Sequence, residues 1–275
     1  MKNKNKIDLQ DRVKPEDIMK KILSLALAAL MLCTACLTMA SCSKETFVIG
    51  ITYFEPMNYM DENGKLTGFE TEFATAVCEK LGYEPEFVEI DWGTKETELN
   101  AGNIDCIWNG MTINDERKEQ MGISNPYMEN KQVLVVKAEN AEKYSTAEGL
   151  TGAAICAEAE SAGEEVAKTD AAFAGANYTA VSTMAMALME VAAGTSDGCV
   201  IDFVTSIGMI GEGTDYADLV VVEAYEFAPE YYGIAFRKTE PDTLDKFNKA
   251  IAELMADGTI DAIAAKYKLD GQLVK

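Results

Sequence analysis

Short apolar runs and longer amphipathic segments alternate along the chain from residue 47 onward. Short runs rich in β-branched and aromatic side chains are typical of buried strands, whereas apolar positions three or four residues apart are typical of helices. The first half predicts strands at 47–52, 84–90 and 104–108, a hairpin turn at 61–64, a helix between 68 and 82, and a short helix that ends near 100.

The second half continues the alternation. It predicts strands at 133–137, 153–157, 198–201 and 232–237, and helices at 163–168, 184–193, 203–210, 244–257 and 259–267. The apolar stripe of Met184, Leu188 and Val191 indicates core packing rather than binding. Alternating strands and helices predict an α/β fold with a parallel-type sheet covered on both faces, and with ligand groups at the carboxyl ends of its strands.

Composition then excludes several functions. The chain has 275 residues, a net charge of −22 and no histidine. This length allows one large domain or two smaller lobes. The acidity argues against a nucleic-acid partner, because no basic patch is available to neutralise phosphates. Without histidine, Ser-His-Asp and Cys-His arrangements and the commonest zinc ligand are absent, which narrows the enzyme options sharply. We predict no catalytic residue, metal or cofactor.

The N-terminal region is typical of an export signal. A basic start at Met19, an apolar run over 22–32 and small residues before Cys42 form a secretory signal peptide. Cys42 resembles the lipidated cysteine of a bacterial lipoprotein, with Cys36 as the competing candidate. We therefore expect residues 1–42 to be the signal segment, with Met19 as an alternative start of translation. An uncleaved membrane anchor is the other interpretation, which polar interruptions disfavour.

Four further cysteines lie in apolar runs without metal-binding spacing: Cys78, Cys106, Cys156 and Cys199. Buried free thiols are the default prediction, and the sequence leaves open whether any disulfide forms.

The stretch from Ile104 to Tyr127 carries candidate chemistry. Its apolar run predicts a strand that stops at Asn109-Gly110. Asn114 suits an N-cap, which places Arg117 in the first turn of a helix, where the dipole disfavours a cation unless an anion meets it. With the glycine N–H and the Thr112 hydroxyl, the guanidinium forms a fork for a carboxylate. The alternative is a solvated surface arginine.

The segments GMTINDER at 110–117 and SNPY at 124–127 resemble the signature of the polar-amino-acid family of bacterial extracellular solute-binding proteins. The resemblance extends from about Phe47 to Tyr267. It implies an α/β, two-lobed type 2 periplasmic-binding-protein fold, in which each lobe is a mixed sheet flanked by helices and two hinge strands cross between them. Lobe 1 would comprise 43–130 plus 229–275, lobe 2 would comprise 131–228, and the crossovers would fall near 128–131 and 228–232.

The resemblance also implies a function. The chain would be a monomeric receptor, lipid-anchored on the extracytoplasmic face of the cell membrane, that delivers a free amino acid to the permease of an ABC importer. An enzyme on the same scaffold, such as a dehydratase, needs a further proton donor or acceptor that the motifs do not offer. A sensory lipoprotein with a vestigial pocket is a third hypothesis.

In this family, the residues at the positions of Gly110, Thr112 and Arg117 hold the ligand carboxylate, and an aspartate at the position of Asp202 holds the ammonium. Asp202 precedes the helix predicted from Phe203, so a plain N-cap is the alternative. The turn at Ser161 and Ala162 would complete carboxylate binding with its N–H groups. Ser161 could equally be only a cap, and Glu160 replaces the usual glycine before it.

Side-chain recognition would involve four more residues. Phe54 and Trp92 match aromatics that flank the ligand stem, although core packing also explains them. Glu158 and Asn109 would face the ligand tail from opposite lobes, while a solvated edge residue is the alternative for Glu158. We expect a cationic ligand, arginine first, then lysine or ornithine, with glutamine or cystine as alternatives.

Overall fold

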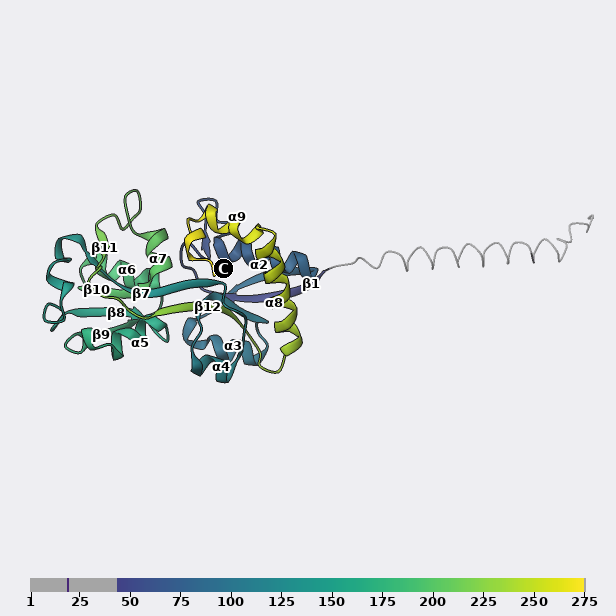
Figure 1. The fold of residues 1–275 in the computed structure, drawn as a ribbon, viewed down its shortest axis with the longest axis horizontal. Coiled ribbons are helices and arrows are strands. Elements are labelled where there is room, and N and C mark those ends of the chain that lie inside the picture. The colour runs from purple at the N-terminus through teal and green to yellow at the C-terminus, as the bar shows by residue number, and fades with distance from the viewer. Residues whose placement is uncertain (1–18, 20–43, 275) are drawn as a thin grey trace, which may run out of the picture. The chain divides into compact units, whose positions relative to one another are not determined.

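The computed structural model describes Met19 and residues 44–274. The predicted signal segment, including Cys42 and Cys36, lies outside the described residues. None of the helices within the described ranges is both long and apolar enough to cross a membrane. The chain from Glu45 onward is one compact unit, drawn as the coloured ribbon in Figure 1.

One sheet combines both ends of this unit. Its strands are β4 (Tyr83–Glu89), β1 (Glu45–Ile51), β5 (Cys106–Thr112) and β12 (Pro229–Phe236), in that order, with β6 (Gly122–Ile123) beside β12. Helices α2 (Phe69–Leu81), α8 (Pro241–Ala256) and α9 (Thr259–Lys266) pack together on one side, α3 (Lys95–Ala101) packs on β5, and α4 (Asp115–Gln120) lies by β6. Ile107 and Trp108 are neighbours on β5 but belong to different apolar clusters, so both faces are covered. We call this part lobe 1.

A second sheet is built from the middle of the chain and forms lobe 2. Its strands are β7 (Met128–Lys137), β10 (Gly198–Asp202), β8 (Ala154–Glu158) and β9 (Asn177–Val181), with β11 (Leu219–Val221) also paired to β7. Helices α5 (Ala162–Thr169), α6 (Met184–Ala193) and α7 (Phe203–Met209) pack against it. Cys156 and Cys199 are register partners on β8 and β10 and, like Cys78 and Cys106, are buried free thiols.

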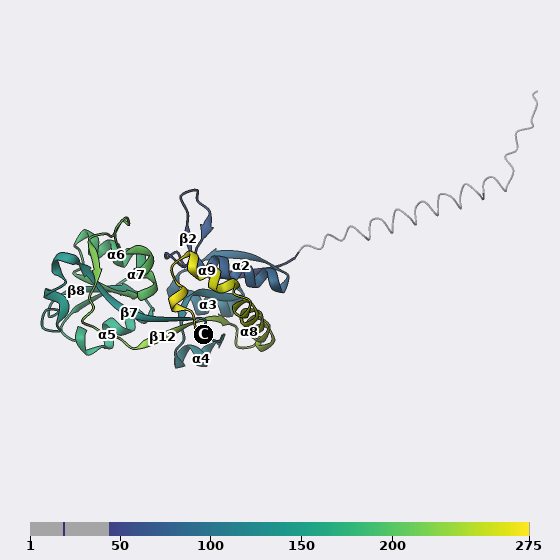
Figure 2. The ribbon, with the colours of Figure 1, turned by 45° about the horizontal axis from the view of Figure 1, so that its top comes forward.

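Two long strands, β7 and β12, join these two sheets into one continuous sheet. The first part of β7 pairs antiparallel with β12, from Met128 opposite Tyr232 to Lys131 opposite Pro229. From Gln132 onward, β7 pairs instead with β10, while β12 continues beside β5. Figures 1 and 2 show β7 and β12 side by side between the two lobes. The two-lobed α/β fold with two crossovers is therefore confirmed, with its sheet mixed because the strands at the crossovers run antiparallel.

Most predicted elements are present, and the differences have local causes. The hairpin at 61–64 joins β2 (Tyr59–Met60) to β3 (Leu66–Thr67), and α6 has its predicted bounds. β5 runs past Asn109-Gly110 to Thr112. Gly110 adopts a φ of 56°, which a glycine tolerates, so it does not end the strand. β9 and β11 were not predicted: β9 carries an exposed, polar pattern on the edge of the sheet, and β11 has only three residues.

Candidate functional site

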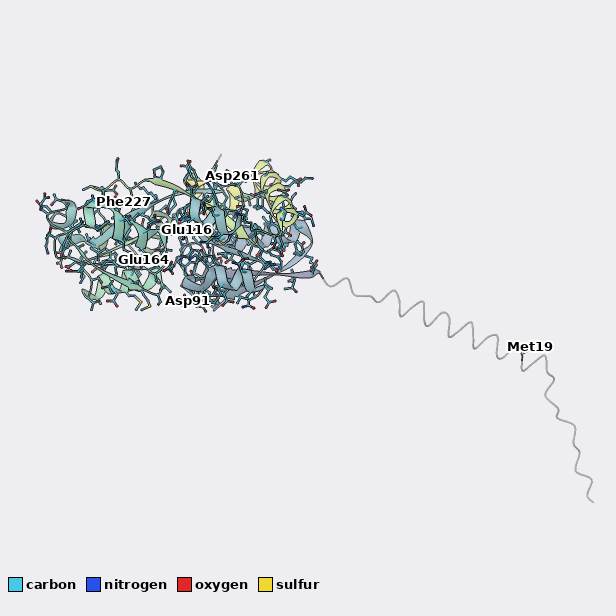
Figure 3. The ribbon with its side chains drawn as sticks, turned by 90° about the horizontal axis from the view of Figure 1, so that it is seen from below. Met19, Asp91, Glu116, Glu164, Phe227 and Asp261 are labelled. Carbon is cyan, nitrogen blue, oxygen red and sulfur yellow. The ribbon has the colours of Figure 1, made fainter. Side chains whose placement is uncertain are left out.

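A small cavity lies where β5 and α4 of lobe 1 meet β8, β10 and the first turn of α5 of lobe 2. Its cavity volume is only about 10 Å³, and it is lined by Trp92, Asn109, Gly110, Thr112, Arg117, Glu158, Ser161, Ala162, Met184 and Asp202. Nine of the ten residues predicted from the sequence are thus brought together, and Phe54 is not among them. A wider cleft beside the cavity is lined by Glu116 of lobe 1 and Glu164 of lobe 2, both labelled in Figure 3.

Arg117 is a buried cation at the wall of this cavity. Asn114 caps α4 by accepting from the Arg117 backbone N–H at 2.8 Å, as predicted, and the side chain is only 7% exposed. Its Nη1 donates to the carbonyl of Thr112 at 2.8 Å, and Nη2 donates to the carbonyl of Glu160 in lobe 2 at 3.3 Å. Across residues 44–274, Arg117 forms no ion pair.

Burial lowers the pKa of the Arg117 guanidinium, and surrounding carboxylates oppose that shift. The interpretation of Arg117 as a solvated surface residue is wrong. A buried guanidinium that donates to carbonyls and, within residues 44–274, forms no ion pair is a strong receptor for an incoming anion.

Gly110 contributes shape rather than its N–H. That N–H donates to Oε1 of the fully buried Glu70 at 2.8 Å, so it is not free for a ligand, which corrects the predicted fork. Glu70 also accepts from the Tyr127 hydroxyl and from Asn58 at 3.0 Å. Burial raises the pKa of Glu70 to about 7, although these hydrogen bonds oppose the shift. A Cβ at Gly110 would lie 2.8 Å from Phe54, so glycine lets the strand pass the aromatic ring.

Asp202 ends β10 and begins α7, but it does not act as a cap. No hydrogen bond joins its side chain to the helix N–H groups. The N–H of Val204 instead donates to Oδ1 of Asn130 at 3.2 Å, so Asn130 supplies the cap from the crossover strand. The Asp202 carboxylate, 6% exposed, is left to line the cavity. The plain N-cap alternative is therefore wrong.

Asp202 has a carboxylate neighbour that the sequence did not point to. Its Oδ1 accepts from the amides of Asn130 and Gln132, and both amides also donate to Oε1 of Glu230 on β12. Burial raises the pKa of Asp202, while the amide hydrogen bonds and the Arg117 charge oppose the shift. The site thus holds two adjacent carboxylates close to one guanidinium.

Glu158 closes the lobe 2 side of the cavity. It stands at the end of β8 and is only 2% exposed, so the solvated-edge alternative is wrong. Burial, then the charge of Asp202, raises the pKa of Glu158 to about 8, and Lys95 opposes the shift. A carboxylate in this setting favours a cationic partner.

Lys95 is a second buried cation near the site and was not predicted. Its Nζ lies 4.7 Å from the centre of the Trp92 ring and donates to the carbonyls of Trp92 at 3.1 Å and Glu160 at 3.4 Å. Burial, then the charge of Arg117, lowers the pKa of Lys95. Lys95 lies three residues after Trp92, which the sequence singled out, and a lysine near such an aromatic residue was the available sign of a cation–π contact.

The turn before α5 keeps a glycine-like shape without glycine. Glu160 has a φ of 59°, and its N–H donates to Glu164 at 2.7 Å. The Ser161 hydroxyl accepts from the N–H of Glu164 at 3.1 Å, so Ser161 is the helix cap. The Ser161 N–H donates to the carbonyl of Glu158 at 3.3 Å, so Ala162 is the residue of the predicted pair whose N–H can serve a ligand.

The remaining predicted residues divide between wall and support. Trp92, 5% exposed, lines the cavity with a buried, unpaired Nε1. Phe54 packs in the core behind Gly110 instead. Asn109 lines the cavity, but its amide holds the first loop through Thr52, accepting from the backbone N–H at 2.8 Å and donating to the hydroxyl at 2.6 Å. Met184, predicted as core, also lines the cavity because its helix begins there.

The arrangement suits a small zwitterion. The cavity is lined by a guanidinium, a helix start and a buried carboxylate, so a carboxylate and an ammonium could be bound together while desolvated. Among the described residues, no group of three potential ligands that could hold a metal ion is present.

These features define a two-lobed solute-binding protein. The model of the bacterial extracellular solute-binding proteins, family 3, matches residues 47–270, and the chain belongs to this family. It is 28% identical to the L-cystine-binding protein TcyJ of Escherichia coli (strain K12), over 82% of this chain and 83% of TcyJ.

Two solved structures have the same fold. An ancestral arginine-binding protein bound to arginine is 34% identical, with a TM-score of 0.74, covering 82% of this chain and 99% of that one. The ancestral amino acid-binding protein AncCDT-1, a precursor of cyclohexadienyl dehydratase, is 31% identical, with a TM-score of 0.73, covering 81% and 95%. The relatives are thus described as binding proteins.

Proposed function

We propose that this protein is the extracytoplasmic receptor of an ABC importer and binds one free amino acid, unchanged, between its lobes. The observation that carries the proposal is the pairing of Arg117 with Asp202 across one cavity, each buried and neither in an ion pair in the described part of the chain. Arg117, the Thr112 hydroxyl and the Ala162 N–H would hold the α-carboxylate. Asp202 would hold the ammonium.

The preferred ligand is a cationic amino acid, arginine first. Glu158 is a buried carboxylate without a hydrogen-bond donor among the described side chains, and it would pair with a guanidinium or ammonium at the ligand tail. Trp92 would flank the stem. Cystine, which TcyJ is named for binding, and glutamine are the alternatives.

The proposed export signal also determines where in the cell we expect the protein. Processing at Cys42 would anchor a monomeric protein by lipid to the outer face of the cell membrane, where it would meet the permease. The lobe bounds that we propose are 43–130 plus 229–275 and 131–228, which agree with the change of partner of β7 at Lys131 and Gln132.

A calorimetric screen of the common amino acids against residues 43–275 tests this function, with mass spectrometry of the ligand afterwards. We expect tight binding of a basic amino acid that is recovered unaltered. Arg117→Lys should weaken binding by about 100-fold, because a point charge cannot replace a buried fork. Lys118→Arg, an exposed neighbour, is the matched control and should change nothing.

Two results would contradict the proposal. Conversion of the ligand would indicate an enzyme on this scaffold. Unchanged affinity in Arg117→Lys would show that the guanidinium does not touch the ligand.

A further inference from the structure

Glu230 and Asp202 form an unusual pair of carboxylates at the crossover between the lobes. One oxygen of each accepts hydrogen bonds from the same two amide nitrogens, Nδ2 of Asn130 and Nε2 of Gln132. Each amide nitrogen has two hydrogens, so each can serve both carboxylates at once. The two acceptor oxygens therefore lie next to each other.

The orientation of the Asn130 amide is fixed independently. Its Oδ1 accepts from the N–H of Val204, so its nitrogen must face the carboxylates. Since Asn130 lies on β7, Asp202 on β10 and Glu230 on β12, the cluster joins both crossover strands to Asp202, which lines the cavity.

Few charges compensate this pair. Arg117 on α4 is the cation that faces it, and Tyr232 and Thr112 are its other polar neighbours. Lys131 and Glu129 flank Asn130 on β7 and point to the opposite face, as successive strand residues do. In the family function proposed above, Arg117 would also meet the ligand carboxylate, which leaves the pair without a cation of its own.

We propose that Glu230 is the second carboxylate of the ammonium subsite, and that the Asp202–Glu230 pair holds one proton until the ligand arrives. This inference rests on the proposed function. When the α-ammonium enters, the carboxyl O–H breaks, its proton passes to the solvent, and N–H donors of the ammonium take its place. The ammonium of the ligand thus replaces the proton as the positive charge on the Asp202–Glu230 pair.

The titration of Glu230 supports this assignment. Burial, then the charge of Asp202, raises the pKa of Glu230 to about 7. Below that pH the free protein holds the proton, and binding must release it, so affinity rises with pH. Above it, the proton is already absent and affinity levels off. A pair of this kind titrates as a unit.

Calorimetry with L-arginine in phosphate and in Tris measures the proton count, since the two buffers differ in ionisation enthalpy. At pH 6, Glu230→Gln should release about one proton fewer than the wild type, because the glutamine amide accepts the same hydrogen bonds but cannot ionise. Above pH 8, this variant should bind about tenfold more weakly. Glu129→Gln removes an exposed carboxylate of the same crossover and is the matched control.

Glu158 could also release a proton to a cationic ligand, so Glu158→Gln is titrated in parallel and should retain the release that depends on Glu230. Equal proton counts in the wild type and Glu230→Gln would overturn the inference. If L-arginine does not bind, the proposed ligand fails, but the inference is still decided by infrared spectra of the ligand-free proteins. The wild type should show one more protonated carboxyl than Glu230→Gln at pH 6, and identical spectra would also overturn it.

Discussion

At the scale of single residues, burial separates the roles that spacing leaves open. Asp202 precedes a helix and could have been a cap, yet Asn130 supplies that cap from another strand. A local pattern contains no information about an acceptor more than seventy residues away, so the sequence could only pose the two alternatives. Glu230 was missed for the same reason, because its partners come from distant segments.

Glu158 illustrates how such a residue affects both selectivity and stability. Glu158→Gln should shift preference from arginine toward glutamine by about ten- to 100-fold, because it removes the carboxylate that a guanidinium would neutralise. Competition calorimetry with both amino acids measures the ratio. An unchanged ratio would show that Glu158 does not contact the ligand.

The same variant should stabilise the ligand-free protein at alkaline pH. The raised pKa of Glu158 means that the folded state holds a proton that the unfolded state releases, so stability falls as pH rises from about 4.5 to about 8. Removing the carboxyl should recover on the order of 1 kcal/mol or more above pH 8, and little near pH 5. Denaturant unfolding at the two pH values gives the comparison. A variant that is equally destabilised at both would contradict it.

At the scale of secondary structure, hydrophobic periodicity located the helices and central strands well, because their burial repeats along the sequence. It failed where burial was weak or a strand was irregular. The edge strand β9 has no clear apolar face. β5 continues through Gly110, although Asn109-Gly110 predicts the end of a strand. That glycine is held from a distance by Glu70, whose carboxylate accepts the Gly110 N–H.

Gly110→Ala therefore tests how β5 presents the site. Its positive φ is strained for alanine, and the new Cβ would lie 2.8 Å from Phe54, so we expect a loss of about 2–3 kcal/mol and weaker ligand binding. Gly64→Ala is the control, since Gly64 has a φ of 73° with no atom within 4 Å of its added Cβ. It should lose only about 1 kcal/mol and bind normally. Equal losses in urea unfolding would mean that contact with Phe54 is unimportant.

At the scale of the whole molecule, Glu160 of lobe 2 contacts lobe 1. Its carbonyl accepts from both Arg117 and Lys95 of lobe 1, although Glu160 itself lies in the strained turn of lobe 2. The family resemblance predicted two lobes from a motif, but it gave no sign of these contacts, since the turn departs from the family glycine. A cation that bonds across the lobes in the closed arrangement and loses that bond on opening favours closure.

Lys95→Met should shift the ligand-free protein toward an open arrangement, because methionine keeps the packing on Trp92 and removes the bond to Glu160. The lost bond is worth about 1 kcal/mol, so the ratio of open to closed molecules should rise about fivefold, and ligand affinity should fall by at most that factor. Small-angle scattering should show a larger radius of gyration without ligand and the wild-type value at saturation. Lys118→Met, an exposed lysine of the same lobe, should match the wild type in both states. An unchanged ligand-free radius together with unchanged affinity would show that Lys95 does not hold the lobes together.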